Sequence, residues 1–283
     1  MKSDRIKIVF NVLTRTAHRP MGFKTCHESI SQQKYQNVRH IVSYENKADL
    51  NYLNEYNLNK IKVEGKERIP ENIDGFIHAP YNLYCNILLN EVEDGWIIFL
   101  DDDDNFLHNK VLQEIEAEIQ KANADTLFIW QMRYPNGKVV PEKQFFKSKK
   151  LELGHIGSPC IAFHSKYKHQ IKWDEWKCAD YRFIKSLYEI IPHKKWIPKI
   201  FIQINNNGDY GRKNDISSNI TSNLIFNKNL IWSILPKYHY RIFNILLFHK
   251  QNYYTLIKIP KRIFKKLSGM VVQITRKKSD KNH

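Results

Sequence analysis

The fold prediction starts from GWIIFLDDDDNFLHNK, residues 95–110. An apolar run, Trp96 to Leu100, stops at four consecutive aspartates, Asp101 to Asp104. A short apolar run that ends in polar residues is typical of a buried strand. Neighbouring carboxylates repel one another, so four of them at the end of such a strand require a positive partner. The sequence therefore predicts a buried strand whose end faces a cation.

Strand and helix patterns alternate around this stretch. The β-branched run at 5–13 leads into a polar segment at 14–20, which we expect to be a turn. The alternation up to about residue 130 predicts an α/β layer with a mostly parallel sheet, in which ligands bind beyond the carboxyl ends of the strands. The further expected strands are 38–46, 61–65, 96–100 and 126–134, and the expected helices are 21–33, 81–92 and 109–122.

The positive charge is concentrated at the end of the chain. The 283 residues carry a net charge of +16 and 42% hydrophobic residues, a composition typical of a globular protein. Residues 216–283 hold 13 Lys and Arg against one acidic residue, whereas residues 1–215 hold 32 against 28. We therefore expect a folded domain over 1–215 and a basic, aromatic-rich and mainly helical C-terminal extension over 216–283.

The remaining sequence features favour a cytoplasmic protein without structural zinc. Its first residues are too polar for a signal peptide, and no apolar run reaches the length of a membrane span. The four cysteines are far apart, form no CxxC pair and are expected to be reduced packing residues. They are Cys26, Cys85, Cys160 and Cys178.

The aspartates predict a site for a hard divalent cation. Oxygen-only ligand sets suit Mg²⁺ or Mn²⁺, which share their coordination with substrate phosphates. In an extended strand, alternate residues point to one side, so Asp101 and Asp103 are expected to point into one crevice. The alternative is an acidic helix start, because carboxylates stabilise the N-terminus of a helix. That alternative explains one or two aspartates more readily than four.

Two stretches resemble family-2 glycosyltransferases of the GT-A fold. The first is VLTRTAHRPMGFKTCHESISQQKYQNVRHIVSYEN, residues 12–46, and the second is GWIIFLDDDDNFLHNKVL, residues 95–112. They resemble the family's opening strand, helix and second strand, and its strand with the DxD motif. The likeness is good over residues 6–130 and looser over 150–190. It implies a Rossmann-like domain that binds a nucleotide sugar at the carboxyl edge of the sheet.

The resemblance also implies roles for individual residues. Thr14, Arg15 and Arg19 would line the nucleotide pocket, and Glu45 or Asn46 would contact the base or the ribose. Asp101 and Asp102 would bind the donor. Asp103, with Asp101, would hold the Mn²⁺ or Mg²⁺ that bridges the diphosphate, although the run of four leaves Asp102 or Asp104 as alternatives. A solvated basic loop is the alternative for Arg15 and Arg19.

Inverting members of the family need a catalytic base, and WDEWKCADYRFIKSLYE, residues 173–189, resembles the segment that carries it. Asp180 would be the base, placed as the N-cap of the following helix, and a purely capping role is its alternative. Asp174 and Glu175 are the next candidates. Conceivable donors on the acceptor side are His155, Ser158 and His164.

A polar loop at 205–215 could close over the diphosphate, with Arg212 and Lys213 supplying positive charge; an ordinary surface loop is the alternative.

The QxxRW motif of processive family members is absent, which argues against polymer synthesis. The predicted function is a metal-dependent, inverting transfer of a sugar from a nucleotide-sugar donor to a glycan or lipid-linked saccharide acceptor. The alternatives are a nucleotidyltransferase, or a non-enzymatic basic surface-binding protein with a structural metal.

The C-terminal extension is expected to bind an anionic membrane surface from the cytoplasmic side. Its basic residues alternate with aromatic ones, and each basic residue near such a surface contributes about 1 kcal/mol. Packing of the extension onto the domain is the alternative, and nucleic acid is a less favoured partner. We predict that the full-length protein co-sediments with anionic liposomes at low salt, whereas a chain truncated after residue 223 does not. Identical behaviour of the two proteins would contradict membrane binding.

Overall fold

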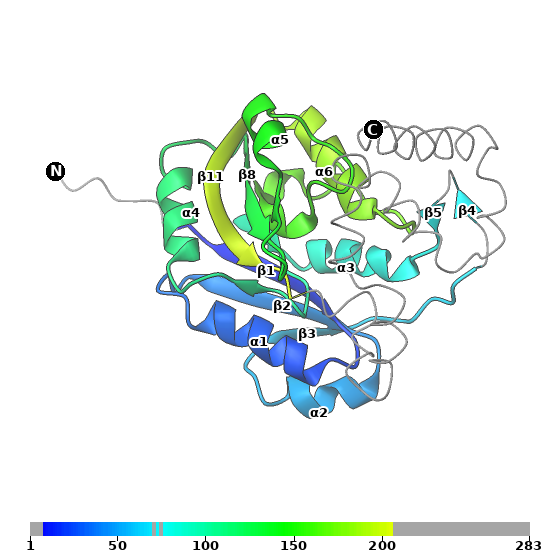
Figure 1. Ribbon diagram of the computed structural model, residues 1–283. Helices are drawn as coiled ribbons and strands as arrows, with labels where there is room; N and C mark the ends of the chain where they lie inside the picture. The colour runs from blue at the N-terminus through cyan, green and yellow to red at the C-terminus, as the bar shows by residue number, and fades with distance from the viewer. Residues whose placement is uncertain (1–7, 70–71, 74–75, 206–283) are drawn as a thin grey trace, which may run out of the picture. The chain divides into compact units, whose positions relative to one another are not determined.

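The computed structural model describes residues 8–69, 72–73 and 76–205, which form an α/β fold around one nine-stranded sheet (Figure 1). The strand order is β3-β2-β1-β6-β10-β8-β11-β7, and β9 pairs with β8 outside this path. The strands are β1 (Phe10–Thr16), β2 (Val38–Tyr44), β3 (Asn59–Lys62), β6 (Trp96–Phe99), β7 (Asn105–Phe106), β8 (Thr126–Arg133), β9 (Val139–Val140), β10 (Ile161–His164) and β11 (His193–Gln203). A separate antiparallel pair consists of β4 (Asn72–Ile73) and β5 (Phe76–Ile77).

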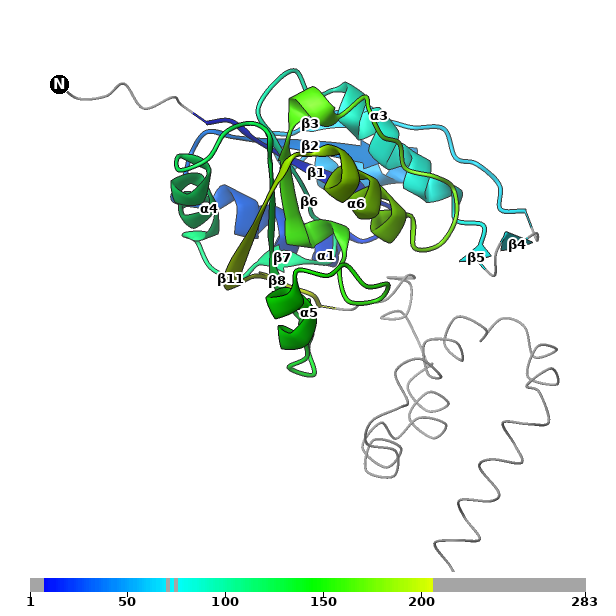
Figure 2. The same ribbon diagram turned by 90° about the horizontal axis from the view of Figure 1, so that it is seen from above.

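The α-helices of the described chain are α1 (Pro20–Ser31), α2 (Leu50–Leu53), α3 (Tyr84–Asn90), α4 (Val111–Ile119), α5 (Lys143–Ser148) and α6 (Ala179–Ile190). Short 3₁₀ helices are η1 (Lys47–Asp49), η2 (Pro80–Leu83), η3 (Ser158–Cys160) and η4 (Ser165–Tyr167). α1 and α3 lie on opposite sides of the sheet, and α6 lies on the same side as α3 (Figures 1 and 2).

Most strands of the sheet run in one direction. β3, β2, β1 and β6 are parallel neighbours, and β8 is parallel to β11. β10 is antiparallel to both β6 and β8, so those two strands share a direction. Only β7, β9 and β10 run against the other strands in the nine-stranded sheet. The predicted α/β class with a mostly parallel central sheet is confirmed.

β6 is the predicted buried strand. All four of its residues are buried, because β1 and β10 flank it and helices cover both faces of the sheet. β1 and β2 run parallel to β6, so their carboxyl ends meet the aspartates at one edge of the sheet. α1 begins next to this edge with Pro20 at its first position, where a missing N–H costs nothing, and buries Phe23, Cys26 and Ile30.

The predicted turn at 14–20 is wrong in its first half. β1 continues to Thr16, and residues Thr14 to Thr16 pair in parallel with Val42 to Tyr44 of β2. This pairing satisfies the backbone polar groups of three residues that look turn-like only because their side chains are polar. The extended strand carries Arg15 and Thr16 to the edge of the sheet, where the aspartates lie.

Several predictions fall outside the described residues. They are the boundary between 215 and 216, the helical extension over 216–283 and the loop residues Arg212 and Lys213. Among the described residues, no helix is long and apolar enough to cross a membrane.

Candidate active site

Alternation along β1 sends neighbouring side chains to opposite faces of the sheet. Thr14 is fully buried on the α1 side, where its hydroxyl lies 3.0 Å from Nε2 of His40. Arg15 points to the side of α3 and contacts Asn82 just before that helix. Thr14 therefore lies beneath the site and does not line an open pocket, whereas the neighbouring Thr16 and Arg15 reach the aspartates.

The four aspartates form a tight turn. The amide of Asp104 donates to the carbonyl of Asp101 at 3.0 Å, which closes a β-turn directly after β6. We predicted that Asp101 and Asp103 point to one side because they alternate along an extended strand. That premise is wrong, because the chain turns at these residues. α1 packs closely on this turn: a Cβ added to Gly22 would lie 3.0 Å from the carbonyl oxygen of Asp102.

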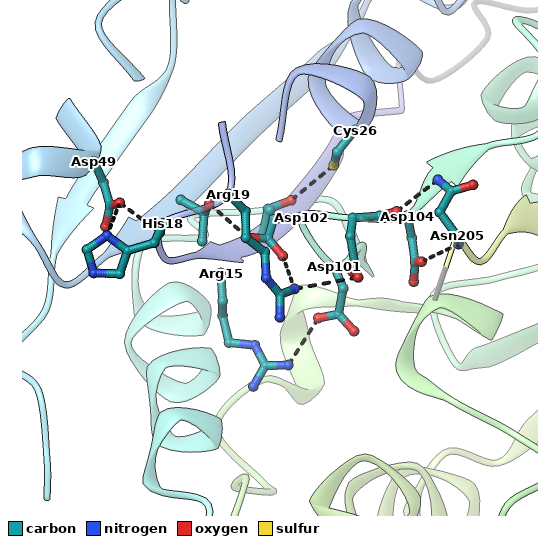
Figure 3. A network of polar contacts seen from close by, with 12 residues as sticks. Arg15, His18, Arg19, Cys26, Asp49, Asp101, Asp102, Asp104 and Asn205 are labelled. Atoms are coloured by element: carbon teal, nitrogen blue, oxygen red, sulfur yellow. Dashed lines mark hydrogen bonds and ion pairs between the residues drawn. The ribbon is translucent and has the colours of Figure 1, made fainter. Parts of the chain in front are cut away.

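Asp102 is held on the α1 side by a guanidinium and a hydroxyl (Figure 3). Arg19 Nη1 lies 2.8 Å from Asp102 Oδ1 and 3.6 Å from Asp103 Oδ2. The hydroxyl of Thr16 donates to Asp102 Oδ2 at 2.8 Å. Since the Thr16 proton is used in that bond, the hydroxyl of Tyr52, 2.9 Å away, acts as the donor to Thr16. Asp102 is thus fixed by the protein itself.

Asp101 is held by the other arginine, on the α3 side (Figure 3). Arg15 Nη2 lies 3.0 Å from Asp101 Oδ1, and Arg15 Nη1 donates to Asn82 Oδ1 at 3.0 Å. The Asp101 side chain is 40% exposed, so one carboxylate oxygen is fixed while the group still meets solvent. An oriented and exposed carboxylate can contact a ligand at the edge of the sheet.

Asp104 is tied to the end of β11. The amide of Asn205 donates to Asp104 Oδ1 at 3.2 Å, and Asn205 Nδ2 donates to the carbonyl of Asp103 at 2.8 Å (Figure 3). Burial raises the pKa of Asp104 well above its usual range, and the charges of Asp101 and Asp103 raise it further. The ionised form of Asp104 is therefore disfavoured at the turn, despite the two arginines.

Burial also raises the pKa of Asp102, from 3.8 to about 7. The guanidinium of Arg19 opposes this shift, whereas the charge of Asp103 adds to it. An added cation at this turn would therefore be stabilised most strongly when Asp102 and Asp104 are ionised.

Asp180 lies in the first turn of α6 and belongs to the same electrostatic group. Burial raises its pKa, the charge of Asp101 raises it further, and the charges of Arg15 and Lys177 oppose the shift. The predicted N-cap position is wrong: α6 begins at Ala179, and its N-cap is Cys178, whose φ is 62°. Asp180 is the second residue of the helix, and its carboxylate accepts a hydrogen bond from the backbone N–H of Tyr181.

The next candidate bases are engaged in the loop before α6. Both carboxylate oxygens of Asp174 receive hydrogen bonds from Arg182, at 2.5 and 2.6 Å. Glu175 lies 3.4 Å from Nε2 of the buried His78. These contacts make Asp174 and Glu175 weaker candidates than Asp180.

The residues predicted to contact the base or the ribose lie after β2. Glu45 is exposed and accepts a hydrogen bond from the hydroxyl of Tyr84 at 3.0 Å. Its carboxylate covers Gly65 so closely that a Cβ there would lie 2.0 Å from Glu45 Oε1. Asn46 Nδ2 lies 2.7 Å from Nε2 of His18 in the loop that follows β1. Both residues are thus at the carboxyl edge of the sheet.

The three predicted acceptor-side donors lie apart from one another. His164 pairs with Trp96, the first residue of β6, and therefore lies at the opposite end of that strand from the aspartates. His155 lies 3.5 Å from Glu142 and against the ring of Phe145, so it packs on α5. Ser158 is buried in η3, next to Gly157, where an added Cβ would lie 3.6 Å from Asp180 Oδ2.

The donor set can hold a Mg²⁺ or Mn²⁺ ion only in part. No group of three or more His, Cys, Asp or Glu side chains in the described part of the chain is arranged to hold a metal. Each of the four carboxylates has a partner within the protein, and Asp101, with a side chain 40% exposed, is more open to a ligand than Asp102 and Asp103, at 5% and 11%. Mg²⁺ is commonly bound by one or two carboxylates together with phosphates and water. The residues therefore fit an ion that a bound diphosphate would also ligate.

Sequence reasoning missed three polar residues of this site. Thr16 donates to Asp102, and Asn82 accepts from Arg15. Asn205, which follows β11, donates to the aspartate turn. The β-branched Thr16, two residues after Thr14, is the only one that a longer first strand would have revealed.

Comparison with known proteins finds similarity only among solved structures: no family model and no curated protein matches the chain. The similar structures include TarS of S. aureus, 17% identical with a TM-score of 0.54 over 72% of this chain and 38% of that one. TarS 1–349 in complex with UDP-GlcNAc is 16% identical, with a TM-score of 0.54 over 75% of this chain and 62% of that one. The same TarS segment in complex with UDP is 16% identical, with a TM-score of 0.54 over 83% of this chain and 77% of that one.

The chain has a GT-A-like glycosyltransferase fold. The resemblance predicted from residues 12–46 and 95–112 is thereby confirmed at the level of the fold. The GT-A-like chain spans less than two thirds of the length of the first matched TarS structures. Identities of 16–19% to these structures establish the shared fold and no more.

We predict that Asp102 makes the fold less stable as the pH rises. Its pKa is raised from 3.8 to about 7, so the folded state binds more protons than the unfolded state between these values. The free energy of unfolding therefore falls through this window, by at most about 4 kcal/mol for this group. Urea denaturation at about pH 5 and about pH 8 gives the free energy of unfolding at each pH. Its decrease between the two should be smaller for Asp102→Asn than for the wild type.

Asp94→Asn is the control for this prediction, because Asp94 is exposed and the backbone N–H of Gly95 lowers its pKa. It should keep the wild-type loss of stability between the two pH values. An equal loss in wild type and Asp102→Asn would show that Asp102 does not titrate in this range.

Proposed function

We propose that the chain is a metal-dependent, inverting glycosyltransferase that moves a sugar from a nucleoside-diphosphate donor to a hydroxyl of a glycan or lipid-linked saccharide. The observation that carries this proposal is the meeting of Asp101 and Asp180 at one edge of a GT-A-like sheet. The two carboxylates come from the end of β6 and the start of α6: the charge of Asp101 raises the pKa of Asp180, and the charges of both raise the pKa of the buried Cys85. In such a pair, Asp101 would contact the donor while Asp180 contacts the acceptor hydroxyl.

The donor would bind at the aspartate turn. Asp101 and Asp103 would hold Mn²⁺ or Mg²⁺, which would neutralise the charge that develops on the leaving nucleoside diphosphate. Arg15 keeps Asp101 oriented, and Asp102 keeps the turn in place through Arg19. Glu45, beyond β2 at the same edge, would contact the nucleoside. Arg212, outside the described residues, is proposed to add positive charge at the diphosphate.

Asp180 would take the proton of the attacking hydroxyl. Its raised pKa makes it a stronger base than an ordinary carboxylate, provided that it is ionised. Burial and the charge of Asp101 raise the pKa, whereas a hydrogen bond from the backbone of Tyr181 and the charges of Arg15 and Lys177 oppose the shift. Activity should therefore rise with pH as Asp180 loses its proton.

The comparisons support this function over the two alternatives. TarS, with which the chain shares its fold, has been seen with UDP-GlcNAc and with UDP, which favours a nucleotide-sugar donor here as well. A structural metal held by protein ligands alone lacks a ligand set among residues 8–69, 72–73 and 76–205. The donor sugar and the membrane contact of residues 216–283 belong to the proposal as expectations from the sequence.

We predict that Asp103→Asn abolishes metal-dependent donor binding. A ligand that binds only the folded state at 100 times its dissociation constant stabilises it by roughly 2.7 kcal/mol. Thermal unfolding with a panel of nucleotide sugars, with and without Mn²⁺, should show such a shift for wild type and none for Asp103→Asn. Asp94→Asn, at the other end of β6 with an 83% exposed side chain, should shift as wild type does. A metal-dependent shift that persists in Asp103→Asn would remove Asp103 from the site.

We predict that Asp180→Asn lowers sugar transfer by roughly 10²- to 10⁴-fold and leaves donor binding intact. The amide has nearly the shape of the carboxylate but cannot accept the proton. Transfer is measured as nucleotide release in the presence of acceptor, and donor binding as the thermal shift. The wild-type rate should fall on the acid side, where Asp180 is protonated. Transfer that survives in Asp180→Asn but is lost in Asp174→Asn would assign the base to Asp174.

A further inference from the structure

The guanidinium of Arg15 is held by two aromatic rings and two polar side chains. Its central carbon lies 5.5 Å from the ring centroid of Tyr81 and 5.8 Å from that of Trp173, within the range of cation–π contacts. Nη2 donates to Asp101 Oδ1 at 3.0 Å, and Nη1 donates to Asn82 Oδ1 at 3.0 Å. The planar guanidinium therefore joins the carboxylate of the proposed donor site to Asn82 in a fixed geometry.

Asn82 is buried in η2 and has its second contact in the segment that leads into α6. Its Nδ2 donates to the carbonyl of Trp176 at 2.9 Å, four residues before Asp180. Both ends of the amide are thus used, since a guanidinium only donates hydrogen bonds and a carbonyl oxygen only accepts them. One buried side chain therefore connects Arg15 on β1 to the segment that carries the proposed base.

The segment between η4 and α6 has further attachments. Asn86 on α3 forms two hydrogen bonds with the backbone of Trp173: its Nδ2 donates to the carbonyl at 2.9 Å, and its Oδ1 accepts from the amide at 2.8 Å. The carbonyl of Trp176 also accepts from Arg182 Nη2 at 3.1 Å. The segment would therefore remain attached without the side chain of Asn82.

Arg15, by contrast, depends on Asn82 for the position of Nη1. Among the described residues, the other acceptor of this nitrogen is the carbonyl of Tyr81, at 3.4 Å and thus near the limit of a hydrogen bond. The Arg15 side chain is 19% exposed, and an N–H of a charged group that loses its partner in such surroundings is costly. Removal of the Asn82 amide would therefore act chiefly on the guanidinium.

We propose that Asn82 is a positioning residue of the transferase, which holds the guanidinium of Arg15 against Asp101 and within electrostatic reach of Asp180. Through Arg15, it would orient the carboxylate of the donor side and keep a positive charge near the carboxylate of the acceptor side. The inference rests on the proposed function, which assigns Asp101 to the donor and Asp180 to the acceptor. Asn82 acts through Arg15 and takes no part in the chemistry itself.

The charges around Asp180 predict how the pH dependence would change. Burial and the charge of Asp101, at the end of β6, raise the pKa of Asp180. The charges of Arg15 on β1 and of Lys177 before α6 lower it. Cys85 on α3 also feels the charge of Asp180 but is a neutral thiol, because burial raises its pKa to about 12. An Arg15 that is no longer held would oppose the shift less, so Asp180 would lose its proton at a higher pH.

The experiment compares Asn82→Ala with Asn86→Ala in the full-length protein. Release of UDP or GDP from UDP-GlcNAc, UDP-glucose and GDP-mannose is measured with Mn²⁺ across a range of pH, with water as the acceptor. We expect Asn82→Ala to lower the rate by roughly tenfold or more, because a hydrogen bond to a charged group is lost. The acid side of its rate profile should move to higher pH. Asn86→Ala removes two hydrogen bonds from the same segment and should keep the wild-type profile.

Arg15→Lys tests whether Asn82 acts through Arg15. Lysine keeps the charge but lacks the planar fork that binds two groups at once. In the Arg15→Lys background, Asn82→Ala should therefore cost much less rate than it does in the wild-type background. An equal cost in both backgrounds, or the same loss and the same shift in Asn86→Ala, would overturn the positioning role.

A folding control is included because Asn82 is only 6% exposed. Urea unfolding gives the folded fraction of each variant under the assay conditions. Asn82→Ser, whose hydroxyl is too short to replace the amide oxygen, gives a second reading should Asn82→Ala unfold, and its profile should shift in the same direction. A loss of rate that only follows the loss of folded protein, with an unchanged pH profile, would overturn the inference.

The wild-type rate separates this inference from the proposed function. No release of nucleotide by wild type from any of the three donors would contradict the proposed glycosyltransferase. Release by wild type at a rate that Asn82→Ala matches would instead overturn the positioning role and leave the glycosyltransferase intact.

Discussion

The site depends on the balance between crowded carboxylates and two half-buried guanidiniums. Four aspartates follow a strand that is buried on both faces, and three of them are themselves buried. Ionised carboxylates in such surroundings are costly unless they are paired. Arg19 and Arg15 provide part of the compensation, yet the pKa values of Asp102 and Asp104 remain raised. The fold thus keeps at the turn carboxylates whose ionised forms a further cation would stabilise.

The alternation of β1 divides this balance between two faces of the sheet. Thr16 donates a hydrogen bond to Asp102 on the α1 side, and Arg15 donates one to Asp101 on the α3 side. The first face fixes the turn, and the second joins the turn to Asp180 and to Tyr81. Arg15 is therefore the physical connection between the proposed donor and acceptor regions. A strand that ended at Leu13 would have provided neither contact.

The charges on the two sides of Asp180 are opposite in sign. Asp101 raises its pKa from the donor side, and Lys177 lowers it from the acceptor side. A carboxylate between such groups responds to what is bound on either side, because a cation near Asp101 or an anion near Lys177 changes the local potential. The GT-A-like fold provides the sheet edge, whereas these particular side chains set the charge around Asp180.

The α/β class, the buried strand at 96–100 and the place of the aspartates at its end could be predicted from the sequence, because apolar runs and periodicity are local properties of the chain. The resemblance gave the GT-A-like fold. The burial of Thr14, the extension of β1 to Thr16 and the effect of Asp101 on the pKa of Asp180, which is not the N-cap of α6, became apparent from the structure. These facts depend on pairing between β1 and β2 and on contacts across more than 60 residues, such as Arg15 with Asn82. No local pattern encodes such contacts, since they arise where separate elements meet at one edge of the sheet.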